Sequence, residues 1–583
     1  MGIKMRKMKS NRIRTDEWKA ASFILSFFMI FLTLPIFAQE SQKQKPELNF
    51  IARYHNQYYE IDPANKYFFS RQSIDISNNS SKSQNTICFL IHPGLSIKQI
   101  GLKDSSGKEI TIKNWQYSGT KKIYGEYDVP VVCIETKEMI LPAEIISFYI
   151  EYKMMAQMIK AEPAQMYEFT VSPKASYAIS PLIGNTPYFG GSTASPYKIT
   201  LKYPEGNQSC VPGELISSAK EGAFIVDIYE HKRRNVPVFA CAPYQKIRKE
   251  DDGIAVEFYL YPTETFSDKM ANDIFGVVNL YFNTFGDNGT YTYKFATVGE
   301  YDSKKMNGEN KGSTIFFPDF VSKNYTSGLE GRYDYIEFLS HEVYHNWNLF
   351  YVNWRGQFSE WFVEGGANFV CAWAAEKIMG DSAGIYIRKK YLERFIREKG
   401  YESTQTLLNV QKTGTAEKAL MYTYGALVWE QFNQKIGTEA LLSGLRHFYD
   451  NYKFQEANFQ DLLNSMSKFT SCDIKSFLDP WLRQNAQIVL SIADVSIIKQ
   501  DGLYETTVTI ESNANGDYEI ITSIAYKTGM DEKMKEIPVT IRGNGKTSIV
   551  FTSDLKPVLI QIDPNYIVPR VNQDQTIWKS LKN

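Results

Sequence analysis

Ser340-His-Glu-Val-Tyr-His-Asn-Trp-Asn348, followed by Trp361-Phe-Val-Glu-Gly365, is the part of the chain that decides how the rest is interpreted. His341 and His345 are four positions apart, and on a helix this spacing places both imidazoles on one face, one turn apart. Glu342 projects beside the space that the two rings share. Two imidazoles with an adjacent carboxylate in this order are typical of a catalytic zinc site. A chance match on an ordinary amphipathic helix is rare, because the chain has only 6 histidines.

A catalytic zinc site needs a third protein ligand and leaves its fourth position to water. Glu364 follows His345 by 19 positions, in a second stretch with an apolar side that can pack against the first helix. Gly356 lies in the intervening segment, which is long enough to turn the chain back. We therefore expect one Zn²⁺ per chain, held by His341, His345 and Glu364.

The combination of H-E-x-x-H with W-x-x-E-G resembles the gluzincin metallopeptidases. More narrowly, it is similar to the alanyl, puromycin-sensitive and leukotriene-hydrolase-type aminopeptidases. This resemblance implies a tyrosine that donates to the oxyanion of the substrate and is followed three positions later by glycine. Tyr422 with Gly425 fits that pattern, and Tyr424 is the alternative. A core tyrosine near a helix start is the competing interpretation.

The resemblance also implies a glutamate that binds the free amino group of the substrate, in a G-x-M-E-N-x-G segment before the zinc helix. Glu309 fits this place within Met306-Asn-Gly-Glu-Asn-Lys-Gly312, although Met306 and Gly308 depart from the family pattern. If no Lys or Arg opposes it, the Glu309 carboxylate is available to a substrate ammonium. The alternative is a polar turn ahead of a strand.

Asn368 lies one helical turn beyond Glu364. Related zinc peptidases place a polar side chain there to accept the outer N–H of a zinc histidine, which fixes the tautomer of that ring. We expect the same of Asn368. A polar helix residue that faces solvent is the alternative.

The net charge of the chain limits which binding partners are expected, and its N-terminal segment indicates its cellular location. Lys plus Arg equals Asp plus Glu at 65 each, so no basic excess indicates nucleic acid, and peptides are the expected partners. A basic segment precedes the apolar run Ala20–Ala38, which is typical of a signal peptide or an uncleaved anchor. We expect an exported protein that is periplasmic, extracellular or membrane-anchored, with any membrane contact made through that anchor.

The cysteines are widely spaced, and an exported chain permits disulfides. Cys210 with Cys241 is the most local pairing. Cys371 falls in the helix of Glu364 and is predicted to be a buried thiol.

The predicted fold is multidomain α+β. Short alternating strands predict an N-terminal antiparallel β domain, helical periodicity then predicts a thermolysin-like α+β catalytic domain, and strands return as a C-terminal β-sandwich. The expected boundaries are 1–38 for the signal peptide or anchor, 39–47 for a linker, 48–245 for the β domain, 246–487 for the catalytic domain, 488–575 for the sandwich and 576–583 for a tail. The long helical C-terminal domain of many family members is not expected.

These features predict an exported zinc-dependent metallopeptidase, with aminopeptidase action favoured. Glu342 would take a proton from the zinc-activated water and deliver it to the leaving amine, and Tyr422 would donate to the oxyanion. The His345-Asn-Trp-Asn348 segment also resembles the glycyl aminopeptidases, so a glycyl-aminopeptidase-like or endopeptidase gluzincin is the alternative. A secreted, metal-holding scaffold without turnover is the alternative of another class.

Overall fold

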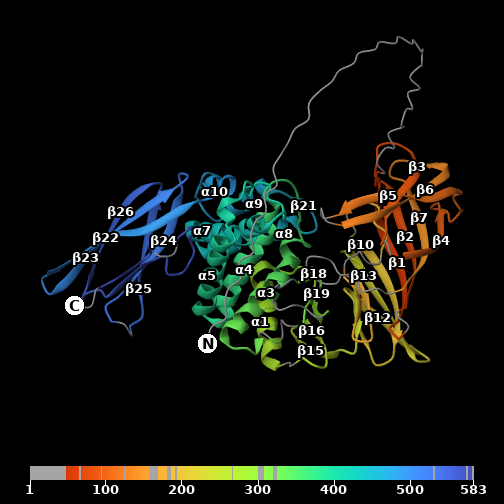
Figure 1. Ribbon diagram of the computed structural model, residues 1–583, viewed down its shortest axis with the longest axis horizontal. Coiled ribbons are helices and arrows are strands. Elements are labelled where there is room, and N and C mark those ends of the chain that lie inside the picture. Colours follow the sequence, from red (N-terminus) through yellow and green to blue (C-terminus); the bar gives the residue numbers. More distant parts are fainter. Residues whose placement is uncertain are drawn as a thin grey trace, which may run out of the picture. The chain divides into compact units, whose positions relative to one another are not determined.

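The computed structural model describes residues 47–580, apart from 65–66, 93–94, 124–126, 156–168, 180–185, 191–193, 265–266, 300–307, 320–322, 324, 530–531 and 573–574. The predicted signal or anchor segment, most of the linker and Met306 lie outside the described residues. Pro46–Asn583 forms one compact unit. Among the described residues, no helix is long and apolar enough to cross a membrane. The fold of this unit is mixed α+β, with a β-rich N-terminal region followed by helices and strands (Figure 1).

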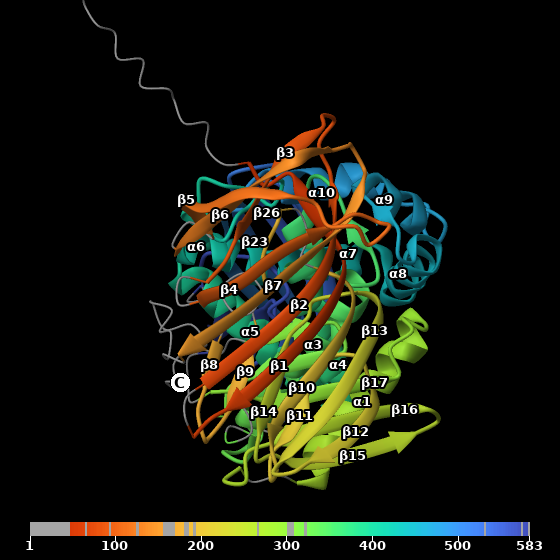
Figure 2. The same cartoon turned by 90° about the vertical axis from the view of Figure 1, so that its right-hand side faces the viewer.

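The N-terminal region consists of strands because buried and exposed residues alternate along it, as they do in β10. One sheet has the order β12-β13-β10-β1-β2-β7-β4, and Figure 2 shows β1, β2, β7 and β4 side by side. Two smaller sheets have the orders β3-β6-β5 and β11-β14-β9-β8. The strands are β1 Phe50–Asp62, β2 Tyr67–Asn78, β3 Gln84–Leu90, β4 Leu95–Lys103, β5 Ile112–Ile123, β6 Tyr127–Ile140, β7 Ile145–Met155, β8 Phe169–Val171, β9 Ser176–Ala178, β10 Ser195–Pro204, β11 Gln208–Cys210, β12 Glu214–Glu221, β13 Phe224–Asn235 and β14 Phe239–Ala242.

The prediction of a purely antiparallel region is wrong at one pair of strands, because β1 and β10 run parallel. A parallel pair needs a crossover of about a dozen residues or more. The chain between Asp62 and Ser195 is long enough to return in the same direction. The alternation of buried and exposed residues along a strand does not show the direction of its neighbour, since it is the same in parallel and antiparallel pairs.

The disulfide prediction is also wrong. Cys88 is bonded to Cys133, which lies directly opposite it in the β3–β6 ladder. Cys210 and Cys241 are free and buried. In the β11–β14 ladder Cys210 faces Ala240, so Cys241 is offset by one residue. A one-residue offset turns a side chain to the other face of the sheet, and these two thiols accordingly pack in different apolar clusters.

The central region begins with a five-stranded sheet in the order β15-β16-β17-β19-β18. Its strands are β15 Gln245–Asp251, β16 Ile254–Leu260, β17 Thr292–Thr297, β18 Glu309–Lys311 and β19 Thr314–Phe317. The helices are α1 Asp268–Phe285, α3 Leu329–Asn348, η2 Trp361–Gly365, α4 Gly366–Met379, α5 Asp381–Arg397, η3 Gly400–Glu402, α6 Thr415–Ala419, η4 Leu420–Tyr424, α7 Gly425–Ile436, α8 Thr438–Tyr452, α9 Phe459–Met466 and α10 Ile474–Arg483. A short parallel pair, β20 Asn353–Trp354 with β21 Glu456–Ala457, joins two loops of this region.

Helix α1 shows why the sequence folds as it does beside the sheet. The Ser267 side chain accepts a hydrogen bond from the Met270 amide and caps the first turn. The apolar side of α1, which includes Ile274 and Tyr281, is fully buried. The Tyr281 ring packs edge-on against Trp347 of α3, with ring centroids 5.8 Å apart. This contact fixes the helix that carries the two histidines.

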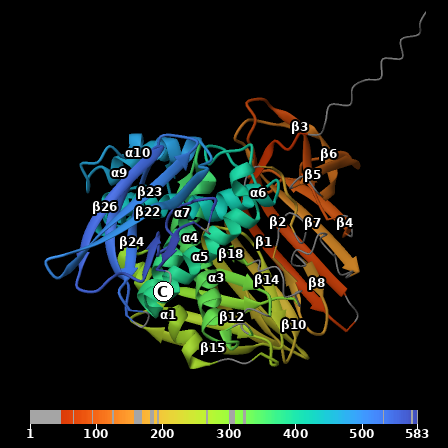
Figure 3. The same cartoon turned by 60° about the vertical axis from the view of Figure 1, so that its left-hand side comes forward.

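The C-terminal region contains two sheets, β22-β23-β26 and β25-β24-β27-β28 (Figure 3). Their strands are β22 Ile488–Gln500, β23 Leu503–Ala514, β24 Glu519–Lys527, β25 Lys535–Arg542, β26 Gly545–Ser553, β27 Leu559–Ile562 and β28 Ile577–Lys579. Both sheets contribute to one core, through Val508 of β23 and Ile524 of β24. The Gln431 side chain of α7 bonds to the main chain of Ile521 in β24. The domain boundaries expected from the sequence stay a prediction.

Candidate metal centre

The C-terminal half of α3 is buried, so its polar side chains need partners. His341 and His345 are one turn apart, and their Nε2 atoms are 3.1 Å from each other. Glu342 lies between them in sequence, and this residue is 8% exposed. The helix therefore presents two imidazole nitrogens at one point.

Glu364 brings a carboxylate to the same point. Its Oε2 lies 3.4 Å from Nε2 of His341 and 3.6 Å from Nε2 of His345. A tetrahedral zinc site with bonds of about 2.0–2.1 Å has ligand atoms about 3.3–3.4 Å apart. The three side chains are no more than 11% exposed, and their ligand atoms lie within 4.8 Å of one another. These donors fit a zinc ion.

Each imidazole is held at its other nitrogen by an asparagine. Oδ1 of Asn368 lies 2.7 Å from Nδ1 of His341, and Oδ1 of Asn348 lies 3.1 Å from Nδ1 of His345. An amide oxygen accepts, so it favours the tautomer that carries the proton on Nδ1 and leaves Nε2 for a metal. Asn348 also donates to the Val363 carbonyl, which ties α3 to the turn before Glu364.

Lys412 contacts the other oxygen of Glu364, with Nζ 2.5 Å from Oε1. Burial alone would raise the pKa of Glu364, but Lys412 and the two histidines hold it well below its usual range. Burial opposes the charge on Lys412, and the carboxylate of Glu364 raises the pKa of that lysine above its usual value. Glu364 is therefore an anion whose two oxygens have different neighbours.

Two glycines allow the turns that carry Glu364 and Tyr422 to approach closely through their backbones. A Cβ on Gly365 would lie 3.0 Å from the carbonyl carbon of Gly425, and a Cβ on Gly425 would lie 3.2 Å from Cα of Gly365. Both glycines end or follow π-helical turns, η2 and η4, which are often found at functional sites. Backbone contact at this point explains why glycine follows Glu364 directly and follows Tyr422 by three positions.

The two candidate tyrosines have different surroundings. The Tyr422 ring lies 6.1 Å from the His341 ring, centroid to centroid. Burial and the Glu364 carboxylate raise the pKa of Tyr422, so its hydroxyl keeps its proton at neutral pH. The Tyr424 hydroxyl is fully buried and donates to the Trp481 carbonyl at 2.8 Å. Its ring stacks on Phe395, away from the histidines.

Glu309 lies on β18, the edge strand of the central sheet. The neighbouring Asn310 side chain donates to the Glu342 carbonyl, so this strand runs beside the histidine helix. The Glu309 carboxylate forms an ion pair with Lys311, with Nζ 2.5 Å from Oε2. Residues two apart on a strand share a face, which brings these two side chains together. The condition that no lysine opposes Glu309 is therefore not met.

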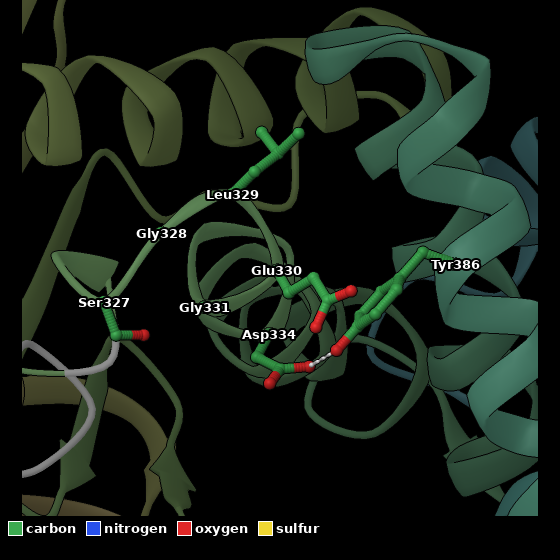
Figure 4. A pocket seen from close by; sticks show the side chains of 7 residues that line it. All are labelled: Ser327, Gly328, Leu329, Glu330, Gly331, Asp334 and Tyr386. Carbon is green, nitrogen blue, oxygen red and sulfur yellow. Dashed lines mark hydrogen bonds between the residues drawn. The ribbon is translucent and has the colours of Figure 1, made fainter.

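A pocket lies at the start of α3, away from this cluster (Figure 4). It is lined by Ser327, Gly328, Leu329, Glu330, Gly331, Asp334 and Tyr386. The Tyr386 hydroxyl donates to the Asp334 carboxylate at 3.4 Å. None of the metal-site residues lines this pocket.

Comparison with known proteins agrees with this geometry. Residues 273–481 match the family model of the peptidase family M1 domain, and this range contains the whole cluster. The matched region is therefore similar to M1 metallopeptidase domains. Aminopeptidase N of Streptomyces lividans is 21% identical over 350 residues, which are 57% of this chain and 38% of that protein. Aminopeptidase N of Lactococcus lactis subsp. lactis is 23% identical over 205 residues, 33% of this chain and 24% of that protein. The mitochondrial aminopeptidase 2 of Saccharomyces cerevisiae is 20% identical over 359 residues, 58% of this chain and 35% of that protein.

The chain spans 24% to 38% of the length of these curated relatives. Sequence reasoning brought His341, His345 and Glu364 together, and it missed two residues of the site. Asn348 could have been found, because it lies one turn after His345 on the same helix. Lys412 gave no signal, since it lies in a loop 48 positions after Glu364 and belongs to no pattern.

Proposed function

We propose that the chain is a zinc-dependent M1 peptidase that removes N-terminal residues from peptides. The observation that carries the proposal is the cluster of His341, His345 and Glu364, buried beside Glu342 within a matched M1 domain. A bound zinc ion would supply Lewis acidity to the substrate carbonyl and to the attacking water.

The residues of the chain then have distinct tasks. Glu342 takes the proton of the attacking water and delivers it to the leaving amine. Tyr422, whose hydroxyl keeps its proton, donates to the oxygen of the substrate carbonyl as negative charge develops there. Asn368 and Asn348 keep the two imidazoles in the orientation that ligation needs.

Aminopeptidase action is supported by the names of the relatives and by the place of Glu309 on the edge strand beside α3. A substrate ammonium would meet a carboxylate that Lys311 already compensates. This ion pair favours a second candidate, a metallopeptidase of the same family that does not require a free N-terminus.

One experiment separates the two candidates. The zinc-loaded protein is incubated with pairs of peptides that have the same sequence and either a free or an acetylated N-terminus, and the products are identified by mass spectrometry. An aminopeptidase shortens the free peptide one residue at a time and leaves the acetylated one intact. Equal cleavage of both supports the second candidate.

The variant Glu342→Gln serves as the control for the chemistry. It removes the base and keeps all three metal ligands, so it should bind zinc like the wild type and lose most of its turnover. Turnover at the wild-type rate would show that Glu342 is not the base. No hydrolysis by the zinc-loaded wild type on any peptide of the set would support the scaffold without turnover.

We also propose that the protein is exported, as its basic and apolar N-terminal segment indicates. The Cys88–Cys133 disulfide supports an oxidising compartment. Expression with and without residues 1–38, followed by fractionation of the cells, tests this proposal. Equal distribution of both forms would contradict it.

A further inference from the structure

Glu364 has two oxygens, and they face different partners. Oε2 points at the Nε2 atoms of both histidines, while Oε1 is 2.5 Å from Nζ of Lys412. A carboxylate can bind a divalent cation through one oxygen or through both. An ammonium at Oε1 competes with a metal for that oxygen and leaves Oε2 open.

The position of Lys412 is held by its own loop. The Gln405 side chain accepts from the Gln411 amide at 2.7 Å and donates to the Thr413 hydroxyl at 3.0 Å, so it clamps the chain on both sides of Lys412. Asn485 in turn donates to the carbonyl of Gln405 at 2.6 Å. The backbone of Lys412 is therefore fixed before any metal or substrate arrives.

The ammonium has further neighbours on the same side of the site. It is 4.0 Å from Oε2 of Glu360, which lies one helical turn before Glu364. It also lies 5.3 Å from the centroid of the Tyr422 ring, within the range of a cation–π contact. Lys412 thus spans the space between the carboxylate ligand and the tyrosine.

We propose that Lys412 is a positioning residue that holds Oε1 of Glu364, so that this glutamate offers a single oxygen to the metal. The inference rests on the proposed function, because it concerns the same metal site. Two effects oppose each other here. The ammonium repels a divalent cation, and it also prevents the carboxylate from turning away from the histidines. The short Lys412–Glu364 contact and the clamped loop lead us to expect that orientation dominates.

The test measures metal binding without any substrate. Zinc affinity is determined by chelator competition for the wild type, Lys412→Met and Lys412→Arg, with Lys399→Met as the matched control. Lys399 is in the same part of the chain and pairs with Glu402, at a distance of 3.2 Å. Lys412→Met should weaken zinc binding by about ten- to a hundredfold, as expected for loss of a partner of a metal ligand. Lys412→Arg should recover most of the affinity, and Lys399→Met should not change it.

A spectroscopic measurement reports on the number of ligand oxygens. The Co²⁺-loaded wild type and Lys412→Arg should share one visible spectrum, typical of four-coordinate cobalt. Lys412→Met should show the weaker bands of a higher coordination number, because the second oxygen of Glu364 is released. A role limited to folding would not change this spectrum in protein that remains folded.

Gln405→Ala keeps the charge and the contact atoms of Lys412 and removes only the clamp. It should weaken zinc binding in the same direction as Lys412→Met and by less, which keeps the proposal testable if Lys412→Met fails to fold. The proposal is overturned if Lys412→Met binds zinc as tightly as the wild type or more tightly. If only Gln405→Ala folds, the same result in that variant overturns it. Failure of the wild type itself to bind zinc would overturn the proposed function as well.

Discussion

Asn368 joins two parts of the site through one side chain. Its Oδ1 lies 2.7 Å from Nδ1 of His341, and its Nδ2 donates to the Tyr422 carbonyl at 2.9 Å. Asn368→Ala removes both bonds in a buried environment. At about 0.5–1.5 kcal/mol for each bond, the free energy of unfolding should fall by about 1–3 kcal/mol. Zinc affinity should fall by about ten- to a hundredfold, because His341 loses the group that orients it.

A second substitution separates the two bonds. Asn368→Asp keeps an oxygen that can accept from His341 and removes the donor to the Tyr422 carbonyl. It should therefore bind zinc at least as tightly as the wild type and still lose peptidase activity, because the turn that carries Tyr422 has lost a support. The assays are chelator competition for zinc and the kcat/KM of zinc-loaded protein.

Asn288→Ala is the matched control. Asn288 is also buried, donates to the Tyr293 hydroxyl at 2.8 Å and accepts from the Thr290 amide at 2.8 Å. Its loss should reduce stability by a similar amount and leave zinc affinity unchanged. If Asn368→Ala binds zinc as tightly as Asn288→Ala, the reasoning about the orientation of His341 is refuted.

Further predictions concern the tyrosines, Glu309 and a buried histidine. Tyr422→Phe should keep zinc and lose about 10²- to 10³-fold in kcat. Tyr424→Phe should lower the midpoint of thermal unfolding and keep kcat. The reverse pattern would exchange the roles of the two tyrosines. Glu309→Ala should reduce kcat/KM on free N-terminal peptides about tenfold and much less on acetylated ones, and equal losses on both would contradict an ammonium-binding role. Burial lowers the pKa of His92 from 6.5 to about 4, so the unfolded state binds the extra proton between these values and stability is lost as the pH falls through that range. Urea unfolding should show a loss of roughly 3 kcal/mol from this group by pH 4, and a loss of the same size in His92→Gln would contradict the assignment.

Local periodicity predicted which site residues share a helix face, whereas the resemblance to a known family implied Tyr422 and Glu309. The spacing of His341 and His345 needs only a helix, and Asn368 follows Glu364 by one turn for the same reason. A helix fixes which side chains share a face, so neighbours along it can be inferred without the rest of the fold.

Contacts between distant segments could not be predicted in this way. The Cys88–Cys133 bond depends on which strands pair and in what register, and neither follows from the spacing of cysteines. Lys412 reaches Glu364 only through the path of its loop. The Glu309–Lys311 pair was accessible in principle, since alternate residues of a strand point the same way, but it required that Glu309–Lys311 be recognised as a strand and not a turn.

The contact between Gly365 and Gly425 has a consequence for how this enzyme can be altered. Main chain meets main chain there, so the two turns that carry the carboxylate ligand and the tyrosine approach as closely as their backbones allow. Lys412 and Asn368 lie between these glycines in sequence and contact Glu364 and the Tyr422 carbonyl, so the stretches that carry them must also be kept. Engineering of this protein can therefore change only segments that make none of these contacts, provided that neither glycine gains even a single methyl group.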